Sequence, residues 1–344
     1  MRFVRHTPIL LSNALLAIRK SLTSTVALCF LIIGALAPPN ASAAWPTDHP
    51  IHLIVPFPAG SSPDLLARIL AEPLRQALKQ NIIVENKPGA GGNLGTRLVT
   101  RAPNDGYTLL YTINGPLTTA PTLYKNTLGY DPIADLAPIT LVGTSPNILV
   151  VNANIDATTA AAFVQQAKAR PGALNYGSVG AGSASHLAME LFKQQAGLDL
   201  LHVPYASFPQ ITTAMLARDI QVAFMVPAIA MPQVKEKKLN VLGVTSLLPF
   251  AALPGVAPLA AQGFDNFEAI SWHALLAPAG TDAALLLKLQ QTLTEILTMP
   301  SIKEKFSAQY FSVVGSDAQT LRALMQTEKN RWDQVIKRLN LSLD

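Results

Sequence analysis

The fold is decided by the stretch IHLIVPFPAGSSPDLLARILAEPLRQAL, which occupies residues 51–78. Residues 51–57 form an apolar run rich in β-branched side chains, and residues 62–78 repeat apolar side chains at helical spacing. Ser62 can cap this helix and Pro63 suits its first position. The stretch therefore predicts a strand that turns tightly into an amphipathic helix.

The same alternation of strands and helices continues along the chain. A strand at 82–84, a helix at 95–102 and a strand at 108–112 complete a β-α-β-α-β unit. Further strands are expected at 148–151, 201–203, 220–226, 241–245 and 271–277, and further helices at 158–169, 184–196, 283–297, 301–308 and 317–339. This order predicts parallel strands with helices on both faces of a sheet. Because no linker-like segment separates the two halves, we expect two α/β units joined by strands that cross between them.

Composition excludes several classes of protein. The chain has 344 residues, of which 49% are hydrophobic and 14% are charged. A disordered chain would be far more polar and charged. A protein with many membrane spans would need several apolar runs of about 20 residues, and only one run approaches that length.

The N-terminus has the pattern of a secretory signal peptide. Four basic residues and no acidic ones precede the apolar run at 26–37, and Ala-Ser-Ala follows at 41–43. We expect cleavage after Ala43, which would lower the net charge from +5 to near +1 and remove Cys29, the single cysteine. The exported protein would then lack disulfides, thiol catalysis and cysteine-bound zinc, and it would have no basic surface for nucleic acid.

Two glycine-containing turns at helix starts are the candidate ligand-binding segments. PFPAGSSPD at 56–64 leaves the opening strand, and GSVGAGSASH at 177–186 leads into the helix expected at 184–196. Free N–H groups at a helix start, together with the helix dipole, bind anions. The alternative for each turn is an ordinary capped connection, with Ser183 as a helix cap and a neutral His186 held by the local backbone.

Other motifs argue against cofactor, metal and catalytic chemistry. KPGAGGNLG at 87–95 begins like a dinucleotide fingerprint, but the pattern that starts at Gly89 fails at Leu94, so we interpret it as a structural turn. YGSVG at 176–180 lacks the first glycine of a nucleophile elbow. Asp64 is interpreted as a helix cap rather than a catalytic acid. No catalytic residue, metal site or cofactor is therefore expected.

Seven segments spread over the chain resemble one family, the Bug family of extracytoplasmic solute-binding proteins that serve tripartite tricarboxylate transporters. They are IVPFPAG at 54–60, VENKPGAGGNLG at 84–95, PNDGYTLL at 103–110, LNYGS at 174–178, SHLA at 185–188, HVPY at 202–205 and APAGT at 277–281. Each segment alone would be weak, but their order and number make the resemblance specific.

The resemblance implies the α/β fold of a type II periplasmic binding protein, in which two α/β lobes close on a ligand in the cleft between them. After a signal peptide at 1–43, the first lobe would combine 44–144 with 269–344, and the second would be 145–268. The implied function is the capture of a small carboxylate in the periplasm, by a monomer that is not an enzyme, for the membrane permease subunits of a tripartite transporter. The alternative is a periplasmic sensing protein that presents its ligand to a membrane signalling partner.

Carried onto this chain, the resemblance assigns ligand binding to backbone amides and hydroxyls. The candidate ligand-binding residues are Phe57, Ala59, Gly60, Ser61, Ser62 and Asn114 in the first lobe, and Ser178, Ser183, Ala184, Ser185, Tyr205, Ser207 and Phe208 in the second. These loops contain no Arg or Lys. The N–H groups of 59–62 and 183–185 would therefore hold the carboxylate, with each helix N-terminus contributing roughly 0.3–2 kcal/mol.

Three features depart from the family pattern. After HVPY the family usually continues with a lysine and two glycines, whereas this chain has Ala206, Ser207 and Phe208. Phe208 either narrows the cleft, stacks on a planar ligand, or packs as an ordinary core or surface aromatic. Ser61 stands where glycine is common, and FMVP at 224–227 is unusually apolar. These departures predict a ligand that combines one carboxylate with an apolar or aromatic part.

Overall fold

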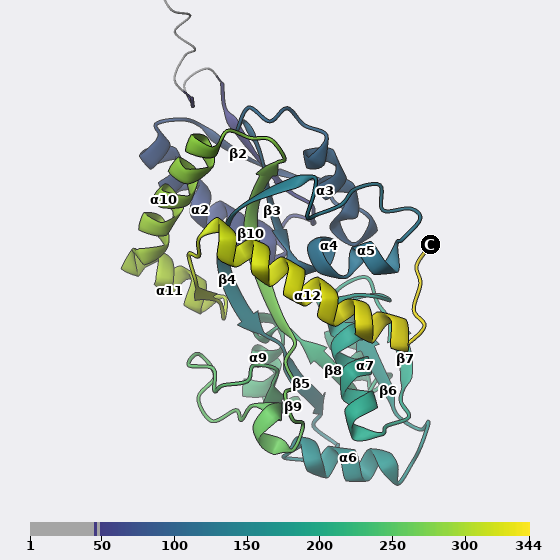
Figure 1. The fold of residues 1–344 in the computed structure, drawn as a ribbon. Coiled ribbons are helices and arrows are strands. Elements are labelled where there is room, and N and C mark those ends of the chain that lie inside the picture. The colour runs from purple at the N-terminus through teal and green to yellow at the C-terminus, as the bar shows by residue number, and fades with distance from the viewer. Residues whose placement is uncertain (1–44, 47–48) are drawn as a thin grey trace, which may run out of the picture. The chain divides into compact units, whose positions relative to one another are not determined.

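Two long strands, β4 (Leu136–Pro146) and β10 (Ile270–Pro278), carry the chain between two β-sheets (Figure 1). The computed structural model describes residues 45–46 and 49–344. The two strands are antiparallel and pair along their whole length. The chain enters the second sheet directly after β4 and returns to the first at β10. We call the parts built on the two sheets the first and the second lobe.

The sheet of the first lobe has six strands in the order β11-β4-β10-β3-β1-β2. Its other strands are β1 (Ile51–Val55), β2 (Ile82–Asn86), β3 (Thr108–Ile113) and β11 (Ser312–Val313). β1 pairs in parallel with β2 and β3, whereas β10 is antiparallel to β3 and β4. The predicted parallel strands of the opening unit are thus confirmed, and the strand predicted at 271–277 joins them as an antiparallel neighbour.

Side chains of β1 alternate between cores on opposite faces of this sheet. Leu53 and Val55 belong to a core covered by α2 (Ser62–Leu78), α10 (Ala283–Thr298) and α11 (Pro300–Ala308). Ile54 belongs to a core closed by α3 (Asn93–Thr100), α4 (Asn114–Thr118) and α12 (Ala318–Arg338). Burial of one such aliphatic side chain is worth roughly 1.5–3 kcal/mol. A register slip would exchange the two faces, so this alternation fixes the register.

The sheet of the second lobe has five strands in the order β7-β6-β8-β5-β9. They are β5 (Ile148–Asn152), β6 (Asn175–Ser178), β7 (Leu201–Pro204), β8 (Val222–Met225) and β9 (Leu239–Val244). β6 is parallel to β7 and β8, and β5 is antiparallel to β8 and β9. One face packs on α6 (Ala160–Lys168) and α7 (Ala184–Ala196), and the other on α8 (Phe208–Ala217) and α9 (Pro227–Lys235).

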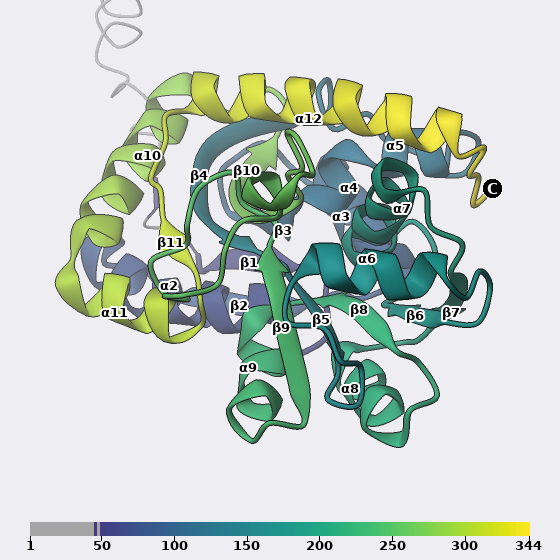
Figure 2. The ribbon, with the colours of Figure 1, turned by 90° about the horizontal axis from the view of Figure 1, so that it is seen from below.

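The last helix, α12, packs against both lobes (Figures 1 and 2). Leu321 and Met325 lie in the first-lobe core that contains Ile54. Further along the same helix, Trp332 and Ile336 lie in the second-lobe core. Figure 2 shows α12 extending from the side of α10 to that of α7. The helix predicted at 317–339 is confirmed, and it bridges the two sheets.

Several elements were not predicted from the sequence. They are β4, β6, α4, α5 (Ala120–Leu123), α8, α9, β11 and the 3₁₀ turns η1 (Ala90–Gly92) and η2 (Leu259–Gln262). The predicted signal peptide at 1–43 lies outside the described residues. Within the part that the structure describes, no helix combines the length and the apolar character needed to cross a membrane.

Candidate ligand-binding site

A cavity of about 510 Å³ lies between the two lobes. Its walls come from the turns that follow β1, β2, β3, β6, β7 and β8, at the carboxyl ends of those strands, where ligands of α/β sheets bind. The lining residues are Pro56, Phe57, Pro58, Ser62, Pro88, Gly89, Gly91, Gly92, Asn93, Ile113, Gly115, Thr119, Ala120, Leu123, Tyr124, Asn147, Val179, Gly180, Ala181, Gly182, Ser183, Ala184, Ser185, Ala206, Phe208, Val226 and Ser271.

The structure brings part of the predicted site together in this cavity. Of the candidate residues, the lining includes Phe57, Ser62, Ser183, Ala184, Ser185 and Phe208. The lining does not include Ala59, Gly60 and Ser61 of the first turn, the buried Asn114 and Ser178, or Tyr205 and Ser207. Each of these residues is nevertheless within three positions of a residue that does line the cavity.

The second turn ends at the N-terminus of α7, where Ser183 caps the helix. Ser183 Oγ accepts the His186 N–H at 3.3 Å, and Ser185 Oγ accepts the Val179 N–H at 3.2 Å. Among the described residues, the amides of Ala184 and Ser185 have no hydrogen-bond partner, and both residues line the cavity. Because α7 has 13 residues, these two N–H groups lie at the positive end of a full helix dipole and can hold an anion.

His186 holds the turn in shape as a neutral ring. The Gly182 N–H donates to His186 Nδ1 at 3.0 Å, so the ring proton is on Nε2. The ring stacks on His202 with a centroid distance of 4.2 Å. Burial, with a smaller contribution from His202, lowers the pKa of His186 to about 4. The neutral form expected from the sequence therefore agrees with the electrostatics of the folded protein.

The distance between Ser178 and His202 is that of a catalytic nucleophile and its base, but the serine hydroxyl is not available to a substrate. Ser178 Oγ lies 2.7 Å from His202 Nε2. The serine is fully buried, and its hydroxyl also lies 3.0 Å from the Gly180 carbonyl oxygen. The hydroxyl donates to Gly180 and accepts from His202, so both of its roles are used within the protein. Through the bond to Gly180, the pair helps to hold the second turn in place.

Asp64 organises the first turn as a buried carboxylate. It accepts the Gly60 N–H at 2.8 Å and hydrogen bonds from Arg68 Nε and Asn86 Nδ2, each at 2.9 Å. Burial alone would raise the pKa of Asp64, but these hydrogen bonds outweigh it and the pKa lies below its ordinary value. The Gly60 amide is thus occupied by Asp64. Ser62 is the residue of this helix start that lines the cavity.

Proline limits three of the other helix starts at the cavity. α2, α8 and α9 have Pro63, Pro209 and Pro227 within their first two positions. Proline has no N–H, so each of these termini offers fewer amide donors than α7. Among these four helix starts, α7 therefore offers the most amide donors.

The turn at 87–95 was interpreted from the sequence as purely structural, but it forms part of the cavity wall. Gly92 has a φ of +98°, and a Cβ there would lie 2.7 Å from Phe57 Cζ and 2.9 Å from Pro116 Cγ. Glycine thus lets the turn approach the Phe57 ring closely. The signal that could have identified this wall is the one used for the other two turns: glycines between a strand and a helix.

The cavity lining combines uncharged polar residues with apolar ones, and it carries no charged side chain in the part of the chain that the structure describes. Nor do residues 45–46 and 49–344 contain a cluster of His, Cys, Asp and Glu suited to a metal. Phe57, Leu123 and Val226 contribute apolar surface. Phe208 both lines the cavity and packs against the second-lobe core around Ile211. A ligand here would meet amides, hydroxyls and apolar side chains.

Asn147 connects the cavity to the point where the chain crosses between the lobes. Its N–H donates to Thr245 Oγ1 at 2.8 Å, and its Nδ2 donates to the Ala269 carbonyl at 3.1 Å. Thr245 Oγ1 also donates to Ala269 at 2.8 Å. All three residues are buried, and Asn147 lines the cavity. The two crossing segments are thus held together beside the cavity.

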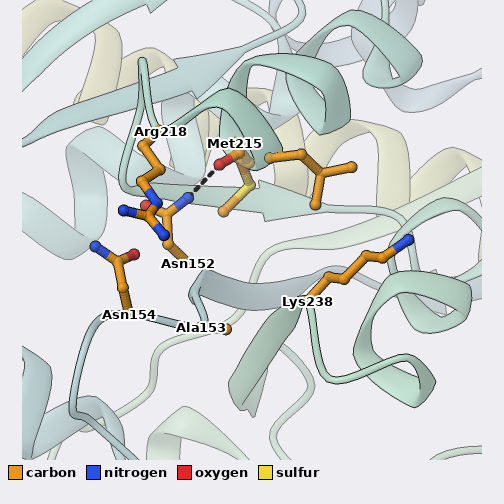
Figure 3. A pocket seen from close by; sticks show the side chains of 7 residues that line it. Asn152, Ala153, Asn154, Met215, Arg218 and Lys238 are labelled. Carbon is orange, nitrogen blue, oxygen red and sulfur yellow. Dashed lines mark hydrogen bonds between the residues drawn. The ribbon is translucent and has the colours of Figure 1, made fainter.

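A second depression, of about 370 Å³, lies at the other end of β5 (Figure 3). Its lining consists of Asn152, Ala153, Asn154, Met215, Leu216, Arg218 and Lys238, and Asn152 Nδ2 donates to the Met215 carbonyl. At about 3.3 Å per residue along a strand, Asn152 is roughly 16 Å from Asn147. With two cationic side chains in its wall, this depression is chemically distinct from the interlobe cavity.

The sequence is similar to a known family and to several relatives in bacteria. The model of the family described as "Tripartite tricarboxylate transporter family receptor" matches residues 66–341. Protein BugT of Bordetella pertussis is 32% identical over 319 residues, which cover 91% of this chain and 96% of BugT. A protein of Pseudomonas sp. strain P51, from the tcbD-tcbE intergenic region, is 31% identical over 303 residues, 87% of this chain and 88% of that protein.

Two solved structures are also similar. R. palustris Rpa4515, solved with adipate, has a TM-score of 0.79 and 28% identity and covers 87% of this chain and 99% of its own. The periplasmic binding protein BugD has a TM-score of 0.75 and 30% identity, with 86% of this chain and 99% of BugD covered.

Proposed function

Because this chain belongs to the tripartite tricarboxylate transporter receptor family, we propose that it is a periplasmic receptor for one small carboxylate with an apolar body. It is a solute-binding receptor and not an enzyme, with the predicted fold of two α/β lobes of a type II periplasmic binding protein. The proposed role is to pass the bound carboxylate to the permease subunits of a tripartite transporter.

The observation that carries the proposal is the pair of unpartnered amides at the start of α7. Ala184 and Ser185, whose N–H groups have no partner among the described residues, line a cavity whose described walls carry no charged side chain. A carboxylate that replaces water there gains charge-assisted hydrogen bonds of about 1.5–3 kcal/mol each. Two serines that line the cavity also lie at helix starts, Ser183 at α7 and Ser62 at α2, and their hydroxyls can assist.

The remainder of the lining favours a ligand that is more than a carboxylate. Phe57, Leu123, Phe208 and Val226 contribute apolar side chains to the cavity. Adipate, which is present in the Rpa4515 structure, combines carboxylates with an aliphatic chain. Here we propose one carboxylate at α7 and an aliphatic or aromatic body against the apolar wall, with Phe208 available to stack on a planar ring.

Export, lobe boundaries and oligomeric state belong to the same proposal. Residues 1–43 are proposed to be a cleaved signal peptide, and the mature receptor is proposed to act as a monomer. We place the second lobe at 145–268, between two parts of the first lobe at 44–144 and 269–344. Support comes from the hydrogen bond that joins Asn147 to Ala269 beside these boundaries.

A thermal-shift screen of residues 44–344 tests the proposal, after unfolding and refolding to remove ligand carried through purification. The panel contains adipate, malate, phenylacetate, amino acids and, as neutral controls, the corresponding amides. A ligand at 100 times its Kd adds about 2.7 kcal/mol, which corresponds to a shift of roughly 5 °C for a chain of this size. A shift confined to carboxylates supports the proposal. A response to the amides alone, or to nothing in the panel, contradicts it.

A further inference from the structure

After α12 the chain turns back toward the ligand cavity. Asn340 has a φ of +51°, and its N–H donates to the Lys337 carbonyl at 3.1 Å. The Leu341 N–H donates to the Ile336 carbonyl, also at 3.1 Å. These paired bonds form a Schellman motif, which ends the helix and fixes the direction of the chain that follows. We call residues 339–344 the tail.

The tail packs one side against the second lobe. Its residues alternate between partly buried and exposed. The partly buried residues pack against the second-lobe core and are Leu339, Leu341 and Leu343. The intervening residues Asn340, Ser342 and Asp344 are exposed.

Hydrogen bonds attach the end of the tail to the first lobe. The Leu343 N–H donates to the carbonyl of Leu123, the last residue of α5, at 2.7 Å. The Asp344 carboxylate accepts the N–H of Asn126 at 2.9 Å, Asn126 Nδ2 at 3.0 Å, and the N–H and Oγ1 of Thr127, each at 3.2 Å. The tail therefore contacts both lobes.

The two attachments meet at Gly182 in the second turn. A Cβ on Gly182 would lie 2.6 Å from Leu123 Cδ1 and 2.8 Å from Leu343 Cδ1. Both leucine side chains therefore rest directly on the Gly182 backbone. Gly182 and Leu123 line the cavity, and the Gly182 N–H is the donor to His186 in the first turn of α7.

We propose that Leu343 is a positioning residue of the ligand site. Together with Leu123 it clamps Gly182, and so it holds the start of α7 in place and fastens the second turn to the first lobe. This inference rests on the proposed ligand cavity. If the lobes separate to release ligand, Leu343 has to leave Gly182 or Leu123, so the clamp slows dissociation.

The test compares Leu343→Ala with Leu341→Ala. Both substitutions remove the same atoms from partly buried leucines of the tail that pack on the second-lobe core. Leu343, unlike Leu341, supplies one of the three atoms nearest to a Cβ on Gly182. The probe is whichever of adipate, malate and phenylacetate stabilises the wild-type protein most. We expect Leu343→Ala to raise Kd about fivefold, mainly through faster dissociation, and Leu341→Ala to leave Kd within about twofold. Leu343→Met, which keeps an apolar side chain of similar size, should restore wild-type binding.

A measurement without ligand separates this inference from the proposed function. Hydrogen exchange of the Gly182 amide should accelerate in Leu343→Ala and stay unchanged in Leu341→Ala, because only the first variant removes the clamp. If the wild-type protein binds no probe, accelerated exchange still supports the clamp while the proposed function fails. Equal effects of both alanine variants on Kd and exchange, or no effect of Leu343→Ala on either, would overturn the inference.

Discussion

Replacing Ala184 with proline removes one of the two amide donors that α7 presents to the cavity and leaves the helix able to form. Ala184 is the first residue of α7, a position that proline favours. Ser183 before it has a φ of −67° and a ψ of 160°, the extended conformation that a residue preceding proline requires. Because the lost amide has no partner among the described residues, we expect the Tm of the ligand-free variant to stay close to that of the wild type.

Ligand affinity should respond strongly to the same change. One charge-assisted hydrogen bond is worth about 1.5–3 kcal/mol, so at 1.4 kcal/mol per tenfold the Kd should rise roughly 10–150-fold. Isothermal calorimetry with the tightest carboxylate of the panel measures this. Ala283→Pro is the matched control, because Ala283 is the first residue of α10 and does not line the cavity. A folded Ala184→Pro protein that binds like the wild type would refute the assignment of the carboxylate to α7.

Three further predictions concern packing, pH and specificity. Gly92→Ala should lower the free energy of unfolding by about 1–3 kcal/mol, since its Cβ would meet Phe57 at 2.7 Å; Gly60→Ala, with no atom within 4 Å, should cost only about 1 kcal/mol for its φ of +79°. Equal losses in urea denaturation would show that the Phe57 ring yields. Burial lowers the pKa of His273 to about 3, whereas a histidine in the unfolded chain has a pKa of about 6.5. The unfolded chain therefore binds a proton at His273 before the folded protein does, and the free energy of unfolding falls as the pH decreases from 6.5 toward 3. Between pH 7.5 and pH 5, the free energy of unfolding of His273→Gln should therefore fall by about 2 kcal/mol less than that of the wild type. An identical dependence of the two unfolding free energies on pH would contradict this. Phe208→Ala should weaken phenylacetate about tenfold and adipate much less; equal weakening in calorimetry would indicate general damage at α8.

The parts of the fold that the sequence predicted well are those in which local signals agree. In the opening unit, the apolar run at 51–57 and the amphipathic pattern at 62–78 point to one element each, and the structure has β1 and α2 there. The helix expected at 184–196 has the bounds of α7, and Gly197, the next residue, adopts the left-handed conformation as its C-cap. Caps and periodicity are properties of neighbouring residues and need no knowledge of the tertiary structure.

The missed elements have local signals that conflict with their tertiary environment. β4 contains Pro138 and Gly143, both of which are unfavourable within a strand. The long pairing with β10 nevertheless stabilises β4 as a strand, with register shifts along the pair. α8 begins with Phe208 and carries adjacent threonines at 212 and 213, and α9 has Pro232 in its interior. Burial of their apolar faces against the second-lobe sheet outweighs this poor helix propensity.

The candidate site shows the same division. Ser183, Ala184 and Ser185 were predictable because a cap and a helix start are encoded by adjacent residues. Asn147 and Ser271 line the cavity only because β4 and β10 bring two distant crossings together. No pattern within either segment marks it as part of a ligand site, so sequence reasoning could not have found them.

The lack of charge in the described cavity lining bears on how such a receptor releases its ligand. A lysine or arginine buried against a carboxylate forms a pair whose separation leaves an uncompensated buried charge. The amides of Ala184 and Ser185 carry only the partial charge of a helix terminus, so a carboxylate can be exchanged for water without that penalty. These amides do not titrate either. Because the pKa of His186 is about 4, the shape of the α7 turn is constant at neutral pH, and binding there should follow the ionisation of the ligand alone.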